Sequence, residues 1–188
     1  GESPLCDLPC VRSHLATFAN PALVQNTGSL SICNRLTKYS TMTPQAPTPF
    51  TFTAKGHENI QASHPSTLEV TTDSHLTLRG DCIVGVKASH SAQDLKSLLE
   101  PVLRLPRCRI RTTLKVGALT DTILGWVSSE FPLSDPSSIV WRTSTFVDER
   151  TIAIRCNKAA KDLDRQLIAA LQNSQSVLEV QLVVTYDT

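Results

Sequence analysis

The feature that most constrains the fold of this chain is an order of strand and helix patterns that occurs twice. Between residues 50 and 116, three strand-like segments precede one helix-like segment and a fourth strand-like segment. The same order returns between residues 118 and 185. Alternating apolar and polar residues predict strands, whereas apolar residues three or four positions apart predict a helix. The sequence therefore predicts an α+β fold made of two similar halves.

The individual segments are bounded by recognisable turn and capping residues. Ser91 and Asp94 form a capping-box pattern for the first helix, Pro101 and Pro106 close it, and Asn157 is the predicted cap of the second helix. The predicted strands cover 50–54, 67–71, 81–86 and 110–116 in the first half, and 122–127, 139–146, 151–156 and 178–184 in the second.

Aligning the two halves tests whether they are repeats. At an offset of 68, the apolar residues of helix and last strand coincide without a gap, as Leu95 with Leu163 and Leu114 with Leu182 show. Gly56 matches Gly125 at 69, and SHPST at 63–67 matches SDPSS at 134–138 at 71. The alternative is that any two strand-helix-strand units share such a pattern. We expect a duplicated unit with approximate two-fold symmetry, antiparallel or mixed sheets, and two helices.

The first 49 residues differ in composition from the rest. No acidic residue occurs between Asp7 and Glu58, and Ser, Thr, Asn and Pro dominate. We expect a disordered leader followed by one globular domain over 50–188. The leader has two interpretations: an organelle transit peptide, which implies a mitochondrial protein, or a non-native extension upstream of Met42, which implies a cytoplasmic one.

Charge and cysteine content narrow the classes of function. Removing the leader's three basic and two acidic residues from the totals of 18 and 17 leaves 15 of each. A neutral domain argues against dedicated nucleic-acid binding. Cys82, Cys108 and Cys156 lie in apolar strand patterns, which predicts buried free thiols in a reducing compartment. No apolar run approaches the roughly 20 residues that cross a membrane.

Two stretches carry a family resemblance. The residues GHENIQASHPSTLEV and LTLRGDCIVGV, with RTSTFVDERTIAIRCNKAAKDLDRQLIAAL later, resemble an archaeal family with eukaryotic relatives, domain of unknown function three-seven-one. Members of that family tend to carry Gly-His and His-Pro pairs in both halves. This chain has Gly125-Trp126 and Asp135-Pro136 in its second half instead. The resemblance implies a compact duplicated domain, and it leaves only the first half to retain a histidine site.

Polar residues of the first half form one candidate site. His57, His64 and Asp81 follow or precede glycine and proline at predicted strand ends or in loops, where sites are usually built. Two imidazoles and a carboxylate suit acid-base catalysis or a divalent metal ion. The alternative is that Asp81 closes a turn and that His64-Pro65 orders its loop, as an Asx-type turn would at Asp135.

A second candidate site is cationic. Arg107, Arg109 and Arg111 alternate along one strand, with no acidic residue between Arg104 and Lys115. Such a row suits phosphate or carboxylate, or it is a charged strand edge that prevents aggregation. The predicted ligand-binding residues, in full, are Arg107, Arg109, Arg111, Arg142, Ser144, Arg150 and Asn157.

These patterns leave three functional hypotheses open. The first is a small enzyme or ligand-binding protein with an anionic or phosphorylated small molecule between the two repeats. The second is an RNA-associated or protein-interaction module that uses the face from Arg104 to Lys115. The third is a structural partner in a larger assembly. Trp126 and Trp141 are expected to pack in or beside the core.

Overall fold

The computed structural model describes residues 49–105 and 107–186, and the predictions for the leader lie outside that range. The order of strands and helices follows the predicted order, with one added 3-10 turn. The first half contains β1 (Phe50–Lys55), β2 (Thr67–Thr71), β3 (Ile83–Gly85), α1 (Lys96–Leu103) and β4 (Arg109–Val116). The second contains β5 (Leu119–Trp126), β6 (Ser138–Arg142), β7 (Thr151–Ala153), η1 (Ala160–Asp162), α2 (Arg165–Leu171) and β8 (Val177–Thr185).

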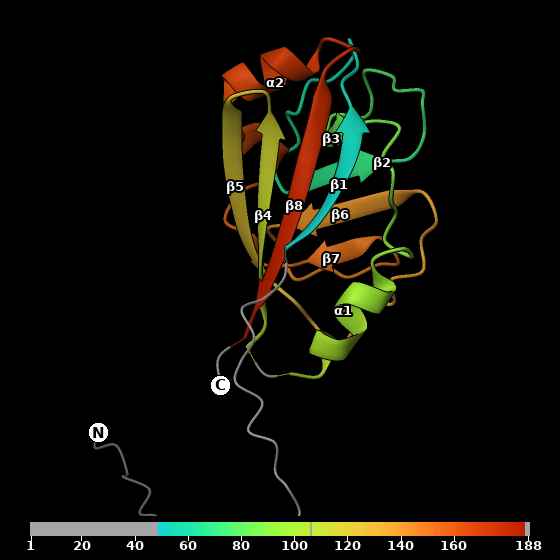
Figure 1. The fold of residues 1–188 in the computed structure, drawn as a ribbon, viewed down its shortest axis with the longest axis vertical. Helices are drawn as coiled ribbons and strands as arrows, with labels where there is room; N and C mark the ends of the chain where they lie inside the picture. The colour runs from blue at the N-terminus through green and yellow to red at the C-terminus, as the bar shows by residue number, and fades with distance from the viewer. Residues whose placement is uncertain (1–48, 106, 187–188) are drawn as a thin grey trace, which may run out of the picture. The chain divides into compact units, whose positions relative to one another are not determined.

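The strands form two four-stranded sheets. Sheet A has the order β1-β8-β4-β5, and all of its pairs are antiparallel. Sheet B has the order β3-β2-β6-β7, in which the central pair is antiparallel and both outer pairs are parallel. Figure 1 looks onto sheet A, with the strands of sheet B running across those of sheet A. The predicted α+β class, with antiparallel and mixed sheets and two helices, is confirmed.

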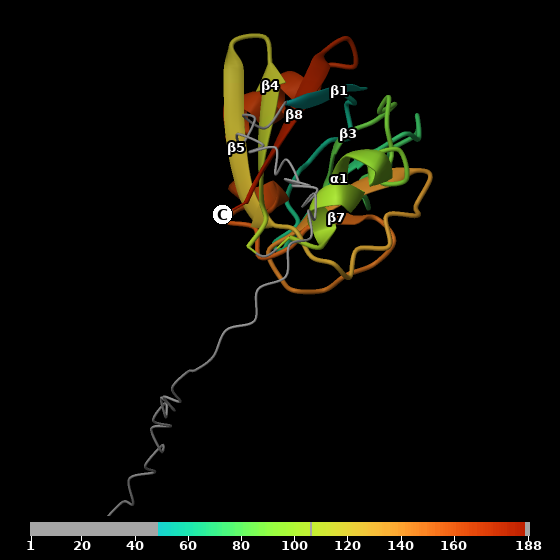
Figure 2. The ribbon, with the colours of Figure 1, turned by 60° about the horizontal axis from the view of Figure 1, so that its bottom comes forward.

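The core lies between the two sheets. Leu68 and Ile139 of sheet B and Leu114 and Leu182 of sheet A belong to one cluster of buried apolar side chains. The Nε1–H of Trp141 donates to the hydroxyl of Thr112 at 2.8 Å, which joins β6 to β4 across this core. Figure 2 shows sheet A on one side of the fold and β3, β7 and α1 on the other.

The first helix begins later than predicted. Ser91 and Asp94 make the expected contact, because the Asp94 carboxylate accepts from the backbone N–H and the hydroxyl of Ser91, both at 2.8 Å. The contact stabilises a turn, however, and the helix itself starts at Lys96. Pro101 lies inside α1 and does not close it. Pro101 lies past the first turn and has no N–H to donate to the carbonyl four residues earlier, and α1 ends soon after it, at Leu103.

The second helix is not capped by Asn157, which corrects the sequence prediction. The segment is divided into η1 and α2, and Asp164 caps α2 by accepting from the N–H groups of Gln166 and Leu167. The Asn157 side chain instead accepts from the N–H of Leu124 in β5. An Asn before a helical pattern predicts a helix cap, but here the side chain is hydrogen-bonded to the backbone at a strand edge.

Two predicted strands are shorter than the sequence indicated because the chain changes sheets. The strand predicted at 151–156 leaves sheet B after Ala153, and Ile154 pairs with Trp126 of sheet A. The strand predicted at 81–86 likewise ends at Gly85, and Val86 pairs with Lys55 of sheet A. The strand predicted at 139–146 ends at Arg142.

Two glycines meet backbone requirements that other residues do not. A Cβ on Gly56 would lie 2.2 Å from the carbonyl oxygen of Asn173, so only glycine fits against the end of α2. Gly117 has φ of +60° and opens the two-residue hairpin between β4 and β5.

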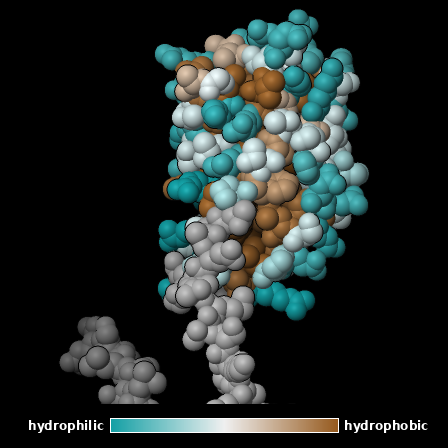
Figure 3. Space-filling view, in the orientation of Figure 1, coloured by the Kyte–Doolittle hydropathy of each residue, from teal (hydrophilic) through white to brown (hydrophobic). Residues whose placement is uncertain are grey.

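Hydrophilic side chains flank a strip of hydrophobic ones on the face seen in Figure 3. Among the helices of the described residues, none has the length and apolar content needed to span a membrane.

Candidate functional site

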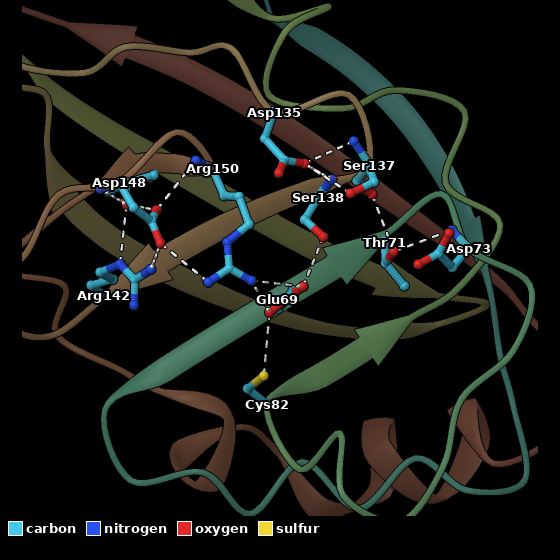
Figure 4. Close-up of polar contacts among 11 residues, drawn as sticks. Glu69, Thr71, Asp73, Cys82, Asp135, Ser137, Ser138, Arg142, Asp148 and Arg150 are labelled. Atoms are coloured by element: carbon cyan, nitrogen blue, oxygen red, sulfur yellow. Dashed lines mark hydrogen bonds and ion pairs between the residues drawn. The ribbon is translucent and has the colours of Figure 1, made fainter.

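The outer face of sheet B carries a polar network. In β2 and β6, alternate side chains point to opposite faces, so Leu68 and Trp141 enter the core while Glu69 and Arg142 face away from it. Glu69 and Arg142 are nonetheless only 7% and 8% exposed. Figure 4 shows that these side chains converge with those of the segment before β7. Buried charges are retained only when they are paired, so each charged side chain of this network needs a partner.

Glu69 is the centre of one half of the network. Its carboxylate accepts from the Ser138 hydroxyl at 2.8 Å and lies 3.3 Å from the nearest guanidinium nitrogen of Arg150. The Cys82 thiol donates to the same carboxylate at 3.4 Å. Burial, followed by the negative charge of Glu69, raises the pKa of Cys82 to about 12. Cys82 is therefore a protonated thiol at neutral pH and not a nucleophilic thiolate.

Asp148 is the centre of the other half. It forms ion pairs with Arg142 and with Arg150, the latter at 3.1 Å, and accepts from the Thr151 hydroxyl at 2.7 Å. Arg142 also donates from Nε to that hydroxyl at 3.0 Å and lies over the Phe146 ring. Burial alone would raise the pKa of Asp148, but the Thr151 hydrogen bond and the two guanidinium groups outweigh burial and lower the pKa.

The network contains two of the predicted ligand-binding residues, Arg142 and Arg150. The structure brings Arg142 and Arg150 together at Asp148. It also pairs both of them with internal carboxylates. Among the described side chains, no buried nitrogen or oxygen lacks a hydrogen-bond partner. Arg142 and Arg150 are thus engaged within sheet B, through Nε and Nη2 of Arg142 and through both terminal nitrogens of Arg150.

A different set of arginines lines a pocket on the outer face of sheet A. The pocket has a volume of about 420 Å³ and lies beside β4 and β5. Its lining residues are Arg109, Ile110, Arg111, Leu124, Gly125, Trp126, Arg155, Asn157 and Thr185. We call this the cationic pocket. Three of the predicted ligand-binding residues, Arg109, Arg111 and Asn157, meet here.

The register of β4 and β5 builds the pocket from cross-strand pairs. Arg109 lies opposite Trp126, and Arg111 lies opposite Leu124. The guanidinium of Arg109 stacks on the Trp126 ring, 4.5 Å from its centroid. Such stacking restrains the arginine while leaving its N–H edges free to bind. The apolar partners therefore position the cationic groups.

Asn157 and Arg155 reach the pocket from the segment that follows β7. Because the N–H of Leu124 donates to Oδ1 of Asn157 at 2.8 Å, the amide NH₂ is left as a donor at the pocket. Arg155 has φ of +49°, and its N–H donates to the carbonyl of Ser144 at 2.9 Å. This left-handed residue directly follows Ile154, which pairs with Trp126 of β5.

The lining offers donors and positive charge with no carboxylate among the described residues. Over 49–105 and 107–186, the ion pairs involve other side chains, and none includes Arg109, Arg111 or Arg155. Lys115, farther along β4, pairs with Glu179 at 3.9 Å. The cationic pocket is thus the place in the described fold where guanidinium groups gather without internal neutralisation.

The three predicted catalytic or metal-ligating residues do not assemble into a metal site. Within the described part of the chain, no group of three His, Cys, Asp or Glu side chains is placed to hold a metal ion. His64 and Asp81 are neighbours through the backbone, since the N–H of His64 donates to the carbonyl of Asp81 at 3.2 Å. His57 lies elsewhere, beside the end of α2, where its N–H donates to the Leu171 carbonyl.

The His64 side chain orders its own loop. Its Nδ1 accepts from the N–H groups of Ser66 and Thr67 at 3.2 and 3.0 Å. Asp135 does the same in the second half, where its Oδ1 accepts from Ser137 and Ser138 at 2.8 and 2.6 Å. Both contacts have the form of an Asx-type turn, which is the alternative that the sequence offered.

The remaining predicted residues are exposed and lie outside the cationic pocket. The Ser144 hydroxyl accepts from the N–H of Phe146 at 3.4 Å, and Arg107 lies in the connection before β4 with φ of +56°. Sequence reasoning missed Glu69, the one acidic residue in β2, whose place in an apolar strand was a signal of a buried ion pair. It also left Arg155 out of the site.

The sequence of this chain is similar to those of a known family. The described fold defines a class, an α+β domain with two packed sheets and a cationic pocket on the outer face of one of them. The sequence profile of the family described as "Domain of unknown function (DUF371)" matches residues 52–185, and the chain belongs to that family. A relative named "Uncharacterized protein MJ0206", from Methanocaldococcus jannaschii, is 34% identical over 129 residues, which cover 69% of this chain and 95% of the relative.

Proposed function

We propose that this domain binds a small anionic molecule in the cationic pocket. The observation that carries the proposal is the convergence of Arg109, Arg111 and Arg155 without a carboxylate in the described lining. Like charges gather at a cost unless a ligand of opposite charge is bound, and guanidinium forks suit phosphate and carboxylate oxygens. The amide NH₂ of Asn157 adds a neutral donor.

The size of the pocket favours a small organic molecule over a bare ion. A volume of about 420 Å³ falls within the range of roughly 300 to 1,000 Å³ that small-molecule sites occupy. Leu124 and Trp126 supply apolar surface next to the charged groups. We infer a ligand with a phosphate or carboxylate and an apolar portion. β4 belongs to the first half, and the other lining elements belong to the second, in keeping with a site shared by the two repeats.

Binding measurements on two charge-removing variants test the proposal. Wild type is screened for thermal stabilisation by nucleotides, phosphorylated metabolites and carboxylic acids, and hits are titrated by calorimetry. Arg111→Met should weaken binding by about tenfold or more, because a charge-assisted hydrogen bond is worth roughly 1.5 to 3 kcal/mol. Lys115→Met is the matched control, since Lys115 lies on the same strand and outside the pocket. Equal affinities in both variants would sink the proposal, as would a screen with no hit.

RNA binding on the same face is the second candidate. Arg109, Arg111 and Lys115 share the outer face of β4, and Trp126 is half-buried beside them. A backbone-binding surface would lose similar affinity in Arg111→Met and Lys115→Met and would show a steep salt dependence. Retention of RNA binding in both variants would remove this candidate. The neutral charge of residues 50–188 is the reason we place it second.

We also propose that residues 50–116 and 118–185 are duplicated halves. Exchanging β1 with β5 and β4 with β8 reverses the order of sheet A onto itself, and the corresponding exchange does so for sheet B. The left-handed residues support the same offsets: Lys87 and Arg155 are 68 apart, and Ala62 and Leu133 are 71 apart.

The contacts favour a different glycine alignment from the one the sequence indicated. The bridge Lys55–Val86 of the first half corresponds to the bridge Trp126–Ile154 of the second. Lys55 and Trp126 are 71 positions apart, and this offset aligns Gly125 with Ala54 and not with Gly56. Superposition of residues 50–116 on 118–185 with these offsets tests the duplication. Backbone paths that diverge within matched strands would contradict it.

We also propose that the protein occupies a reducing compartment of the cell. Cys82, Cys108 and Cys156 are free thiols, which supports the reducing cytoplasm or mitochondrial matrix that the sequence suggested. We favour the cytoplasm, and fractionation of the full chain tests this assignment.

A further inference from the structure

A second, smaller pocket lies at the end of β1, against the loop that follows α2. It has a volume of about 230 Å³. Its lining residues are Lys55, Gly56, His57, Ser74, Val86, Lys87, Ser174 and Gln175. We call it the lysine pocket. It is lined by two lysines and a histidine, and the described lining contains no carboxylate.

Backbone pairing fixes both lysines beside the pocket. The N–H of Lys55 donates to the carbonyl of Val86 at 2.7 Å, and the N–H of Val86 returns to Lys55 at 2.9 Å. Lys87 follows directly with φ of +50°, and its N–H donates to the Asp73 carbonyl at 2.8 Å. The two ammonium groups therefore start from adjacent, hydrogen-bonded positions of the backbone. Neither lysine forms an ion pair with another described residue.

His57 adds a donor whose tautomer the structure defines. The N–H of Asn59 donates to Nδ1 of His57 at 3.1 Å, so Nδ1 carries no proton and Nε2 carries one. The backbone of His57 is held in place because its N–H donates to the Leu171 carbonyl at 2.9 Å. Glu58 lines an adjoining hollow with His57 and the residues after α2, outside the lysine pocket.

We propose that the lysine pocket is a second anion site, which binds a single phosphate group. Two lysines, one histidine and the serines Ser74 and Ser174 line a volume about half that of the cationic pocket. Ammonium groups bind phosphate as point charges and impose little geometry, so a compact tetrahedral oxyanion fits this set. The group is either free phosphate or the phosphate of a monoester.

The two pockets have a common cation position, which provides a matched pair of variants. Lys87 and Arg155 each follow a residue that bridges to sheet A, and each has a left-handed backbone. Asparagine adopts this conformation more readily than most residues and carries no charge. Lys87→Asn and Arg155→Asn should therefore both fold, and each removes a cation from one pocket only.

Titration of the full chain with inorganic phosphate, followed by amide NMR shifts, tests the second site. Wild type should show saturable shifts at Gly56, His57 and Lys87. Lys87→Asn should weaken this binding by about fivefold to tenfold, and Arg155→Asn should leave it unchanged. A parallel titration with methyl phosphate identifies the source: similar affinity indicates a monoester site, and loss of binding indicates a site for the free ion.

Three outcomes would overturn the inference, and they separate it from the proposed function. One is an unchanged phosphate affinity in Lys87→Asn. Another is a set of shifts confined to Arg111 and Arg155, which would support the cationic pocket and eliminate the lysine pocket. The third is the absence of saturable shifts in wild type. If the lysine pocket binds phosphate while no ligand occupies the cationic pocket, the proposed function fails and the second site stands.

Discussion

The two groups of arginines in this fold differ in whether carboxylates pair with them, although the sequence does not distinguish the two groups. Arg142 and Arg150 lie on the outer face of sheet B, where internal carboxylates neutralise them. Arg109, Arg111 and Arg155 lie on the outer face of sheet A, where the described lining offers no carboxylate. The first group is engaged in contacts within the fold, and we propose that the second binds a ligand. Variants in the first should lose stability, and variants in the second should lose binding.

The largest effect is expected at Asp148. Its side chain is 17% exposed and joins both network arginines to Thr151. Asp148→Asn leaves two guanidinium groups without their shared charge, which should cost about 2 to 3 kcal/mol of unfolding free energy. Urea denaturation measures this loss. Glu149→Gln is the control, because among the described residues Glu149 accepts hydrogen bonds through its backbone carbonyl, and this variant should stay near wild type.

A change below 0.5 kcal/mol in Asp148→Asn would break the comparison, since the network would then be dispensable. The arginines that it holds would be free to bind a ligand, and sheet B would have to be reconsidered as the site.

Acid should weaken the fold through the same carboxylate and through Asp121. Burial opposes ionisation of Asp121, but the Lys158 ion pair and the N–H groups of Asp164 and Thr122 outweigh it and lower the pKa of Asp121. A carboxyl whose pKa is lowered in the folded state stabilises the protein above its unfolded pKa, near 3.8. This stability is lost as the pH falls below that value toward the folded pKa.

Unfolding free energy should therefore be level from pH 7 to about pH 5 and decline below it. Asp121→Asn should start lower at pH 7 and decline less steeply. Denaturation curves between pH 7 and pH 2.5 measure both slopes, and parallel slopes for the two proteins would refute the assignment to Asp121.

The order of elements was predictable because strand and helix periods are local. β4 shows this most clearly: Ile110, Leu114 and Val116 alternate with polar residues, and the structure buries all three. The alternation also placed Arg109 and Arg111 on one outward face before their partners were known. Helix starts were less predictable, because Asn157 has the residue type of a cap and serves β5 instead.

The candidate site was predictable only in part because its closing residues depend on long-range contacts. Arg155 reaches the cationic pocket through a left-handed backbone at the point where the chain leaves sheet B for sheet A. No local pattern marks such a crossing. Likewise, the pairing of Arg150 with Glu69 joins residues 81 positions apart. The sequence identified cations, and only the fold determined which of them are paired.

The loop contacts of His64 and Asp135 should have intermediate effects. Asp135→Ala removes two charge-assisted bonds from backbone N–H groups, of 2.6 and 2.8 Å, and a third from the Ser137 hydroxyl at 2.9 Å, and should cost about 1 kcal/mol. His64→Asp should be close to neutral, because an aspartate accepts the same two N–H groups. Thermal unfolding measures both. A loss of more than 2 kcal/mol in His64→Asp would show that the imidazole has a role beyond ordering its loop.

The smallest stability effects are expected in the cationic pocket, where they complete the comparison. Arg111 and Arg155 are exposed and unpaired with other described residues. Arg111→Met and Arg155→Asn should change the unfolding free energy by less than about 0.5 kcal/mol, as is usual for surface positions. Removing one of three like charges should even stabilise the unliganded protein slightly, since mutual repulsion falls. Urea denaturation without ligand and at low salt detects this sign. A loss of 2 kcal/mol in either variant would mean that these arginines, like Arg142 and Arg150, are structural, and the distinction between the two groups would disappear.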